Sequence, residues 1–227
     1  MQNHLDELSK WTENNLMLLN EEKSNYIIFS RSKQNFCTRL ELNNSNLERV
    51  SVTRILGIWL QEDLGWAENT KQICKKAYSR LSVLNKLKYA GICIEDLLAI
   101  YTLFIRSVTE YCSVAFHSSL TDVLSLKIEH IQSTCLKVIL SENYVSYDAA
   151  LEMCNLERLS IRRDKRLLNF ALKCTKSDFN KKMFPKNKNI HNKDVYEVNF
   201  ARTESYRKST IIQCQNLLNS HSSKKSN

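Results

Sequence analysis

Residues 67–91 read AENTKQICKKAYSRLSVLNKLKYAG, and this stretch decides the fold of the chain. Its apolar residues recur every three or four positions, which predicts one long amphipathic helix. The members of this stripe are Ile73, Ala77, Leu81, Leu84 and Leu87. Gly91 follows the last of them and predicts the end of the helix, because glycine readily adopts the left-handed conformation of a C′ residue.

Downstream of this stretch the helical period continues. It predicts helices from about residue 95, over 120–140, over 146–155 and over about 158–175. Thr121 and Asp122 are the expected caps of the helix over 120–140. The helix from residue 95 has a wide apolar face and is expected in the centre of the core; this face carries Leu97, Leu98, Tyr101, Phe104, Ile105 and Val108.

The two ends of the chain have different patterns. A helix is expected over 3–16, and strands are expected over 25–31, 37–43 and 53–60, where β-branched and aromatic residues are frequent. A lysine- and asparagine-rich loop is expected over 177–194, and disorder from Asn219 onward. The predicted fold class is therefore α+β, with a small antiparallel β piece and one helix at 1–66, a mostly α-helical bundle at 67–176, and a basic, loosely ordered tail at 177–227.

The composition supports a mostly helical, intracellular protein. The 227 residues include only 3 Gly and 1 Pro, so glycine-rich phosphate loops and β-sandwiches fit poorly. No stretch approaches the roughly 20 apolar residues of a membrane span, and the amphipathic start does not resemble a signal peptide. We therefore expect no membrane association and no secretion, with the protein in the nucleus or cytoplasm. The 8 Cys include no C-x-x-C pair, which favours buried, reduced thiols over the alternative of a zinc site.

The net charge of +9 is unevenly distributed. Residues 1–70 carry 7 basic and 10 acidic side chains, whereas residues 71–227 carry 26 basic and 14 acidic ones. Such a change of sign indicates a region that faces a polyanion. The alternative is a solvated, lysine-rich helical surface.

Two basic clusters have helical spacing. The first is expected on one flank of the long helix and comprises Lys71, Lys75, Lys76 and Arg80. The second comprises Arg158, Arg162, Arg163 and Arg166. Side chains at i and i+4 lie on one face of a helix, so each cluster predicts contacts with nucleic-acid phosphates. A solvated flank is the alternative for each.

The sequence contains no motif of a catalytic site. It has no Asp-Asp pair and no D-x-D motif that would hold two divalent metal ions for phosphoryl or nucleotidyl transfer. His117 and His130 are candidates for a general base, but a lone histidine is more typical of a structural role.

The order of several short segments is more specific than any one of them. From the N-terminus they are Trp11, Leu19-Asn20, Lys23-Ser24, Phe29-Ser30-Arg31, Leu56-Gly57-Ile58, Leu64-Gly65-Trp66, KKAYSRLSVLNKLKYAG at 75–91, IYTLFIRSVTEYCSVAFHSSL at 100–120, IEHIQSTCLKVIL at 128–140 and ARTESYRKST at 201–210. Over about residues 3–219 the chain resembles the C-terminal part of the reverse transcriptase of non-LTR retrotransposons (LINE type, jockey-like), from the end of the palm through the thumb. Two departures are Phe116, where the family commonly has Trp, and Ile212, where it often has Pro.

The resemblance implies an origin in an RNA-directed DNA polymerase. In that family, the segment with Leu56, Gly57 and Ile58 belongs to the hairpin that grips the primer, and the next helix tracks the template–primer backbone. The chain begins after the metal-binding aspartates of the family, so we expect binding of RNA or an RNA–DNA hybrid without catalysis. No cofactor is expected in this chain, since magnesium would belong to the missing palm.

Two other functions remain open from the sequence. One is a helical protein-interaction module with no role in nucleic-acid binding. The other is a polymerase subunit whose aspartates come from a separate chain. A truncated palm would also expose strand edges, so we expect self-association, and we expect no small-molecule substrate.

Overall fold

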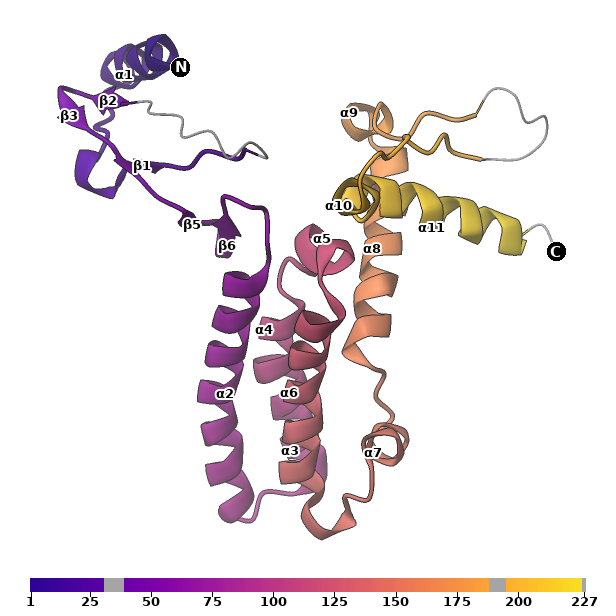
Figure 1. The fold of residues 1–227 in the computed structure, drawn as a ribbon. Helices are drawn as coiled ribbons and strands as arrows, with labels where there is room; N and C mark the ends of the chain where they lie inside the picture. The colour runs from indigo at the N-terminus through magenta and orange to yellow at the C-terminus, as the bar shows by residue number, and fades with distance from the viewer. Residues whose placement is uncertain (31–38, 188–194, 226–227) are drawn as a thin grey trace. The chain divides into compact units, whose positions relative to one another are not determined.

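The computed structural model describes residues 1–30, 39–187 and 195–225 (Figure 1). The chain divides into two compact units, Met1–Glu68 and Asn69–Asn227. Short strands occur in the first unit and long helices in the second, which confirms the predicted α+β, mostly helical fold class.

The first unit combines one helix with very short strands. Its elements are α1 (Gln2–Asn14), the 3-10 helix η1 (Glu21–Lys23), β1 (Asn25–Tyr26), β2 (Glu41–Leu42), β3 (Ser45–Asn46), β4 (Glu48–Arg49), β5 (Val52–Ile55) and β6 (Ile58–Gln61). They form three two-stranded sheets, of which β1–β4 is parallel while β2–β3 and β5–β6 are antiparallel. The strands predicted over 25–31 and 37–43 shrink to two residues each in the described part, and residues 31, 37 and 38 lie outside the described residues.

A β-hairpin replaces the single strand predicted over 53–60. Ile55 pairs with Ile58, so Leu56 and Gly57 form a two-residue turn. The φ angles of these two residues are 49° and 89°, and a type I′ turn needs positive φ at both positions. The residue pattern did not indicate this turn, because leucine is unfavourable in the left-handed conformation, although the family resemblance implied a hairpin in this segment. Leu56, which falls within the strand predicted over 53–60, is 87% exposed.

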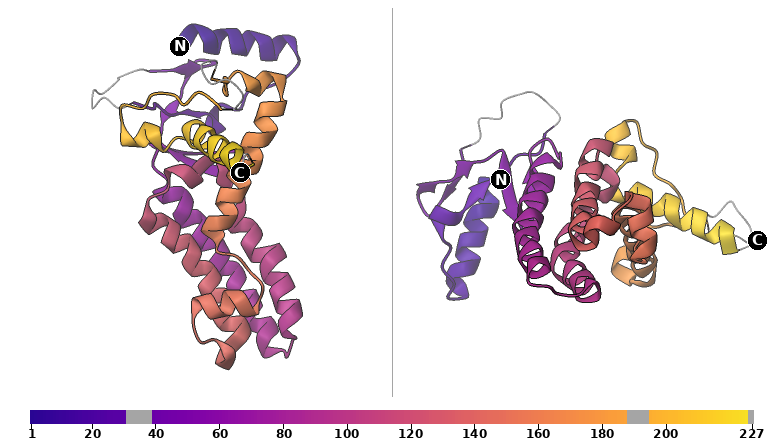
Figure 2. Two further views of the ribbon diagram at one scale, coloured as in Figure 1. Left: turned by 90° about the vertical axis from the view of Figure 1, so that its right-hand side faces the viewer. Right: turned by 90° about the horizontal axis from the view of Figure 1, so that it is seen from below.

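The second unit is built from helices. They are α2 (Ala67–Tyr89), α3 (Ile94–Ile100), the π-helical turn η2 (Tyr101–Ile105), α4 (Arg106–Glu110), α5 (Ser113–Phe116), η3 (His117–Ser119), α6 (Asp122–Leu140), η4 (Ser141–Asn143), α7 (Tyr147–Met153), α8 (Leu159–Lys176), α9 (Asp178–Lys181), α10 (Glu204–Arg207) and α11 (Thr210–Lys225). Figures 1 and 2 show α6 between α2 and α8. The four helices predicted downstream of residue 91 are therefore present close to their expected bounds.

The ends of the predicted helices carry the expected caps. At the end of α2, the Ile92 N–H donates to the Leu87 carbonyl at 3.2 Å, and the Gly91 N–H donates to the Lys88 carbonyl at 3.0 Å. With φ of 82° at Gly91, this is a Schellman motif. At the start of α6, the Thr121 hydroxyl accepts from the Leu124 N–H. Both sequence predictions are confirmed.

The core of the second unit gathers the apolar faces of α2, α3, η2 and α6. Its fully buried members include Leu84, Leu97, Tyr101, Ile105, Ile128, Ile131, Leu136 and Ile139. The helix from residue 94 is central, as predicted, but Phe104 is 41% exposed. The π-helical turn explains this difference, because the wider turn rotates the residues that follow relative to an α-helical stripe.

The helical run Ile94–Ser119 is long and apolar enough to cross a membrane by length and composition, contrary to the sequence expectation. A core helix of a soluble domain passes the same test. In this run Leu97, Tyr101 and Ile105 are fully buried, and the charged Glu110 is buried as well. These features are typical of a core helix.

The C-terminal region over 177–227 was predicted as a loosely ordered tail, and helix α11 shows that this prediction is wrong for Thr210–Lys225. Residues 188–194 and 226–227 lie outside the described residues. Helix α11 packs on α8, where a hydrophobic cluster joins Leu167, Ala171, Cys174, Phe184, Cys214 and Leu218. The Asn219 side chain donates to the Tyr196 carbonyl at 3.0 Å and accepts from the Tyr196 N–H at 2.7 Å. The polar composition after residue 219 hid the apolar residues before it that hold the helix in place.

The cysteines are only partly buried. Cys135, Cys174 and Cys214 are buried and free, as predicted, whereas Cys93 and Cys112 are free but exposed. Burial raises the pKa of Cys135 and Cys214 to about 12. Cys37 lies outside the described residues.

Candidate nucleic-acid interface

The first basic cluster lies on two sides of α2 rather than on one flank. Lys75 lies four positions after Lys71 and three positions before Tyr78, so these three side chains share one side of the helix. Measured around the helix axis from Lys75, Lys76 lies about 100° away and Arg80 about 140° away, because each residue turns the helix by about 100°. The Arg80 guanidinium donates to the Phe104 carbonyl and lies 4.2 Å from the centre of the Phe104 ring.

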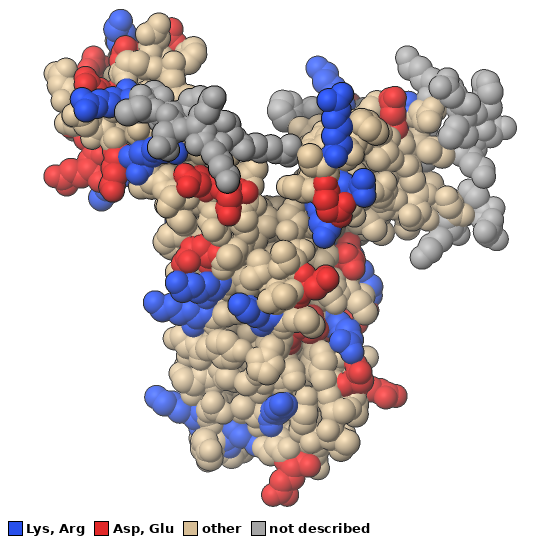
Figure 3. Space-filling model, viewed as in Figure 1, with Lys and Arg blue, Asp and Glu red and all other residues tan. Residues whose placement is uncertain are grey.

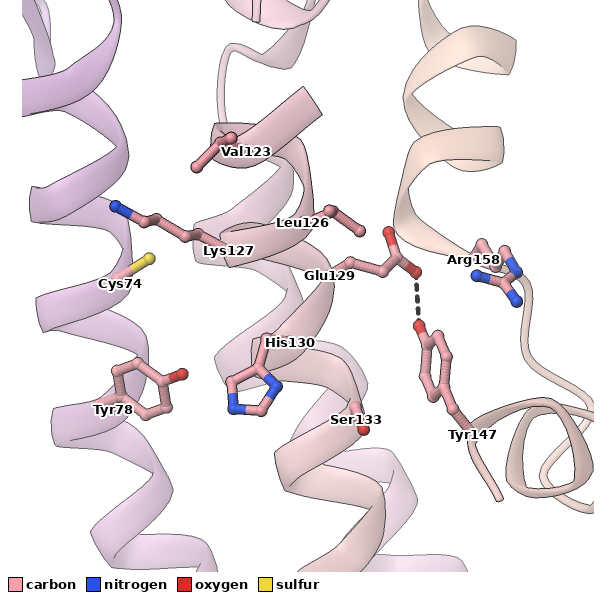
Figure 4. Close-up of a pocket in the computed structure, with 10 residues that line it drawn as sticks. All are labelled: Cys74, Tyr78, Val123, Leu126, Lys127, Glu129, His130, Ser133, Tyr147 and Arg158. Atoms are coloured by element: carbon pink, nitrogen blue, oxygen red, sulfur yellow. Dashed lines mark hydrogen bonds between the residues drawn. The ribbon is translucent and has the colours of Figure 1, made fainter. Parts of the chain in front are cut away.

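The side of α2 that carries Tyr78 borders a groove of about 720 Å³ against α6 and α7 (Figure 4). Cys74 and Tyr78 line it from α2, Lys127 and His130 from α6, and Tyr147 from α7. Figure 4 shows Lys127 extending from α6 toward Cys74. We call this cavity the α2–α6 groove. It brings together residues that are 50 to 70 positions apart in the sequence.

One end of the α2–α6 groove is closed by a buried carboxylate. Glu129 accepts a hydrogen bond from the Tyr147 hydroxyl at 2.5 Å, and its two oxygens accept from the Leu159 and Ser160 N–H groups at 3.0 and 3.1 Å. The carboxylate therefore caps the N-terminus of α8, where the N-cap residue Arg158 has no side-chain cap of its own. Its hydrogen-bonding capacity is used within the fold.

The groove keeps its phenols and thiol in the neutral form. Burial raises the pKa of Tyr78 and of Tyr147, and the hydrogen bond to Glu129 raises that of Tyr147 further. Burial also raises the pKa of the Cys74 thiol, although the charge of Lys127 opposes this effect. The phenols and the thiol are therefore neutral at neutral pH, whereas the charged residues of the lining are Lys127, Glu129 and Arg158.

Exposed lysines lie in this groove and beside it: Lys127 of α6 lines it, and Lys71 and Lys75 lie on the side of α2 that carries Tyr78. Lys71, Lys75 and Lys76 of α2 and Lys127 of α6 are exposed, and Figure 3 shows Lys and Arg side chains gathered over α2. Within the described ranges, Lys75, Lys76 and Lys127 form no ion pair. Their charge remains available to an anion.

The second basic cluster, on α8, is mostly engaged in contacts within the fold. Arg162 and Arg166 both bind the carboxylate of Glu110, which is 4% exposed; the Arg166 nitrogen lies 2.6 Å from it. The hydrogen bond to Glu110 raises the pKa of Arg162. Arg106 lies 4.0 Å from the same carboxylate. Three arginines thus share one buried acid.

Arg163 cannot contact a phosphate in this conformation, because its side chain is fully buried. Its Nε donates to Nδ1 of His117 at 3.1 Å, and its terminal nitrogen donates to the Ser125 hydroxyl at 2.8 Å. Burial lowers the pKa of this guanidinium. The prediction that Arg163 belongs to an exposed cluster is therefore wrong, and His117, which also binds Asp164 at 2.7 Å, has a structural role.

Of the remaining predicted residues, Arg158 is already paired and the other three belong to the first unit. Arg158 lines the groove, but its guanidinium pairs with Asp148 at 2.5 Å and lies 5.3 Å from the centre of the Tyr147 ring. Leu56, Gly57 and Ile58, predicted to grip a primer, belong to the first unit, where they form the hairpin turn and the first residue of β6.

Sequence reasoning missed the residues that complete the groove. Tyr78 was detectable, since it lies three positions after Lys75 on the same helix. Lys127 and His130 gave no such signal, because only the packing of α6 beside α2 brings them close to the lysines of α2.

Among the described residues, no group of three or more His, Cys, Asp or Glu side chains is arranged to hold a metal ion. Comparisons with protein-family models, with curated proteins and with solved structures found no match to this chain.

Proposed function

We propose that the second unit binds the phosphate backbone of nucleic acids without sequence specificity, through the lysines at the border of the α2–α6 groove. One observation carries the proposal: the exposed Lys127 of α6 lines the groove, the exposed Lys75 lies on the side of α2 that carries the lining residue Tyr78, and neither lysine forms an ion pair with a described residue. A lysine ammonium binds phosphate as a point charge and carries no base information.

The proposed ligand is RNA or an RNA–DNA hybrid, and the proposed origin is the reverse transcriptase of a non-LTR retrotransposon. The order of the sequence segments supports this origin, as does a β-hairpin followed directly by a long basic helix. This origin would place the protein inside the cell. We propose binding only, and no polymerase activity for this chain by itself.

The test is the salt dependence of binding to a labelled RNA–DNA hybrid, measured by fluorescence anisotropy. The test variant combines Lys71→Gln, Lys75→Gln and Lys127→Gln. The control variant combines Lys173→Gln, Lys176→Gln and Lys182→Gln, which removes three exposed lysines elsewhere and lowers the net charge equally.

We expect the plot of log affinity against log salt to be shallower by about 2 to 3 in the test variant, since each phosphate contact contributes about 0.9 to this slope. The control should retain most of the original slope. Equal slopes in the two variants would show that only the overall charge of the protein matters, and would contradict the proposed site.

A protein-binding role is the second candidate, and exposed apolar residues on α6 favour it. Val123 is 63% exposed and Leu126 is 66% exposed, and both line the α2–α6 groove. The absence of hybrid binding at low salt by a folded sample would favour this alternative.

A further inference from the structure

The α2–α6 groove offers ring faces as well as positive charge. Tyr78 is 40% exposed and His130 is exposed, and they project from facing helices into the same groove (Figure 4). A planar ligand could stack on either ring, because every nucleic-acid base has a π-face. A duplex presents only base edges and phosphates, since its base faces are stacked on one another.

The remaining lining of the groove is mostly apolar. Val123 and Leu126 of α6 form part of it, beside the Cys74 thiol of α2. The volume of about 720 Å³ lies within the range of small-molecule sites, roughly 300 to 1,000 Å³. The groove therefore has room for a base and an apolar surface to receive it.

The charges around the groove favour the binding of a negatively charged ligand. The Glu129 carboxylate is buried and accepts hydrogen bonds from Tyr147 and the start of α8, and Asp148 is paired with Arg158. The exposed side chains of Lys75 and Lys127, which form no ion pair with a described residue, are both positive. An acidic ligand with planar rings matches this combination better than an apolar peptide does.

We infer that the α2–α6 groove binds an unpaired base of single-stranded nucleic acid, stacked on Tyr78, while Lys75 and Lys127 hold the neighbouring phosphates. This inference rests on the proposed function and narrows it to a substrate class. The second unit would thus prefer single strands, or duplexes with a single-stranded extension, over blunt duplexes.

The test compares a labelled single-stranded RNA with a blunt RNA–DNA hybrid of the same length. Tyr78→Leu removes the ring and keeps an apolar side chain in its place. Tyr89→Leu is the matched control, because Tyr89 lies on the same helix, is 91% exposed and does not line the groove. Thermal melting of each variant establishes that it is folded.

We expect Tyr78→Leu to weaken binding of the single strand about tenfold, within the range measured for loss of one stacked base. Binding of the blunt hybrid should change less than twofold, and Tyr89→Leu should change neither. Equal affinities of the two variants for the single strand would overturn the inference. If the unmodified protein shows no salt-dependent binding to either ligand, this result would instead overturn the proposed function.

A second measurement does not depend on the folding of a variant. A single-stranded RNA that contains 4-thiouridine is cross-linked to the unmodified protein by light, and the adducts are located by mass spectrometry. Adducts on Tyr78 or His130 would support the inference, and adducts confined to residues outside the groove would overturn it.

Discussion

The basic residues of α2 and those of α8 have different surroundings. On α2, Lys75 and Lys76 are exposed and form no ion pair within the described part of the chain. On α8, Arg162 and Arg166 share the buried carboxylate of Glu110. The two clusters have the same size and similar spacing in the sequence, so their difference arises from the elements that pack beside them.

The acid that pairs with the arginines of α8 comes from a distant part of the chain. Glu110 lies at the end of α4, 52 and 56 positions before its two partners. Arginine suits such a site, because its planar fork donates several hydrogen bonds to one carboxylate. The α2 cluster is rich in lysine, which carries its charge on a long, solvated stem. Residue type is therefore a better guide than the count of charges.

Glu110→Gln should have the largest effect, since it removes the shared acid and leaves the arginines without a counter-charge. We expect the free energy of unfolding to fall by about 3 to 5 kcal/mol, as for other broken buried ion pairs. Urea denaturation measures this change. The exposed Glu152→Gln should stay within about 0.5 kcal/mol of the parent protein. A loss below about 1 kcal/mol at Glu110 would mean that the arginines are effectively solvated.

A pair of single variants tests the comparison directly. Lys75→Glu should weaken binding of the RNA–DNA hybrid roughly tenfold at low salt, because it replaces an available cation with an anion. Arg166→Gln should change the affinity less than twofold, because its charge is already engaged by Glu110. Anisotropy at one low salt concentration measures both. Similar losses in the two variants would place α8 at the interface as well.

Two half-buried thiols provide a footprint of the bound ligand. Cys74 lines the groove, and Cys154, which follows α7, does not. Burial raises the pKa of both thiols, so the reactive thiolate is scarce at neutral pH and increases as the pH rises. Single-stranded RNA should slow alkylation of Cys74 several-fold at mildly alkaline pH and leave Cys154 unchanged. Mass spectrometry of labelled peptides measures this, and equal protection of both thiols would argue against binding in the groove.

Arg158→Gln should have the smallest effect. Its ion pair with Asp148 joins side chains that are 44% and 75% exposed, and solvent screens such pairs to about 0 to 1 kcal/mol. Stability should therefore fall by less than about 1 kcal/mol, and hybrid affinity should change less than twofold. A strong loss of affinity for the hybrid would show that Arg158 belongs to the candidate interface.

The sequence predicted the helices well because their signals are local. The stripe from Ile73 to Leu87 and the Schellman glycine, Gly91, both lie within α2 and the residues that follow it. The residue pattern alone missed the hairpin turn, since Leu56 adopts a backbone conformation that leucine rarely adopts, whereas the family resemblance implied a hairpin there. The burial of Arg163 was missed since its partners, His117 and Ser125, come from other elements.

The residues of the candidate site were likewise predictable only in part. The lysines of α2 are visible as a local cluster, whereas the groove depends on the packing of α6 beside α2. No spacing rule within one helix connects Lys75 to Lys127. The part of the site that lies on one element was therefore predictable, and the part that two elements share was not.

The carboxylate of Glu129 has a consequence for hydrogen exchange. The first N–H groups of a helix normally lack a partner within the helix and exchange rapidly with water. At α8, the amides of Leu159 and Ser160 are held by a side chain of α6 that also binds Tyr147 of α7. These two amides should therefore exchange as slowly as the middle of the helix, and should become exposed only when α6, α7 and α8 separate together.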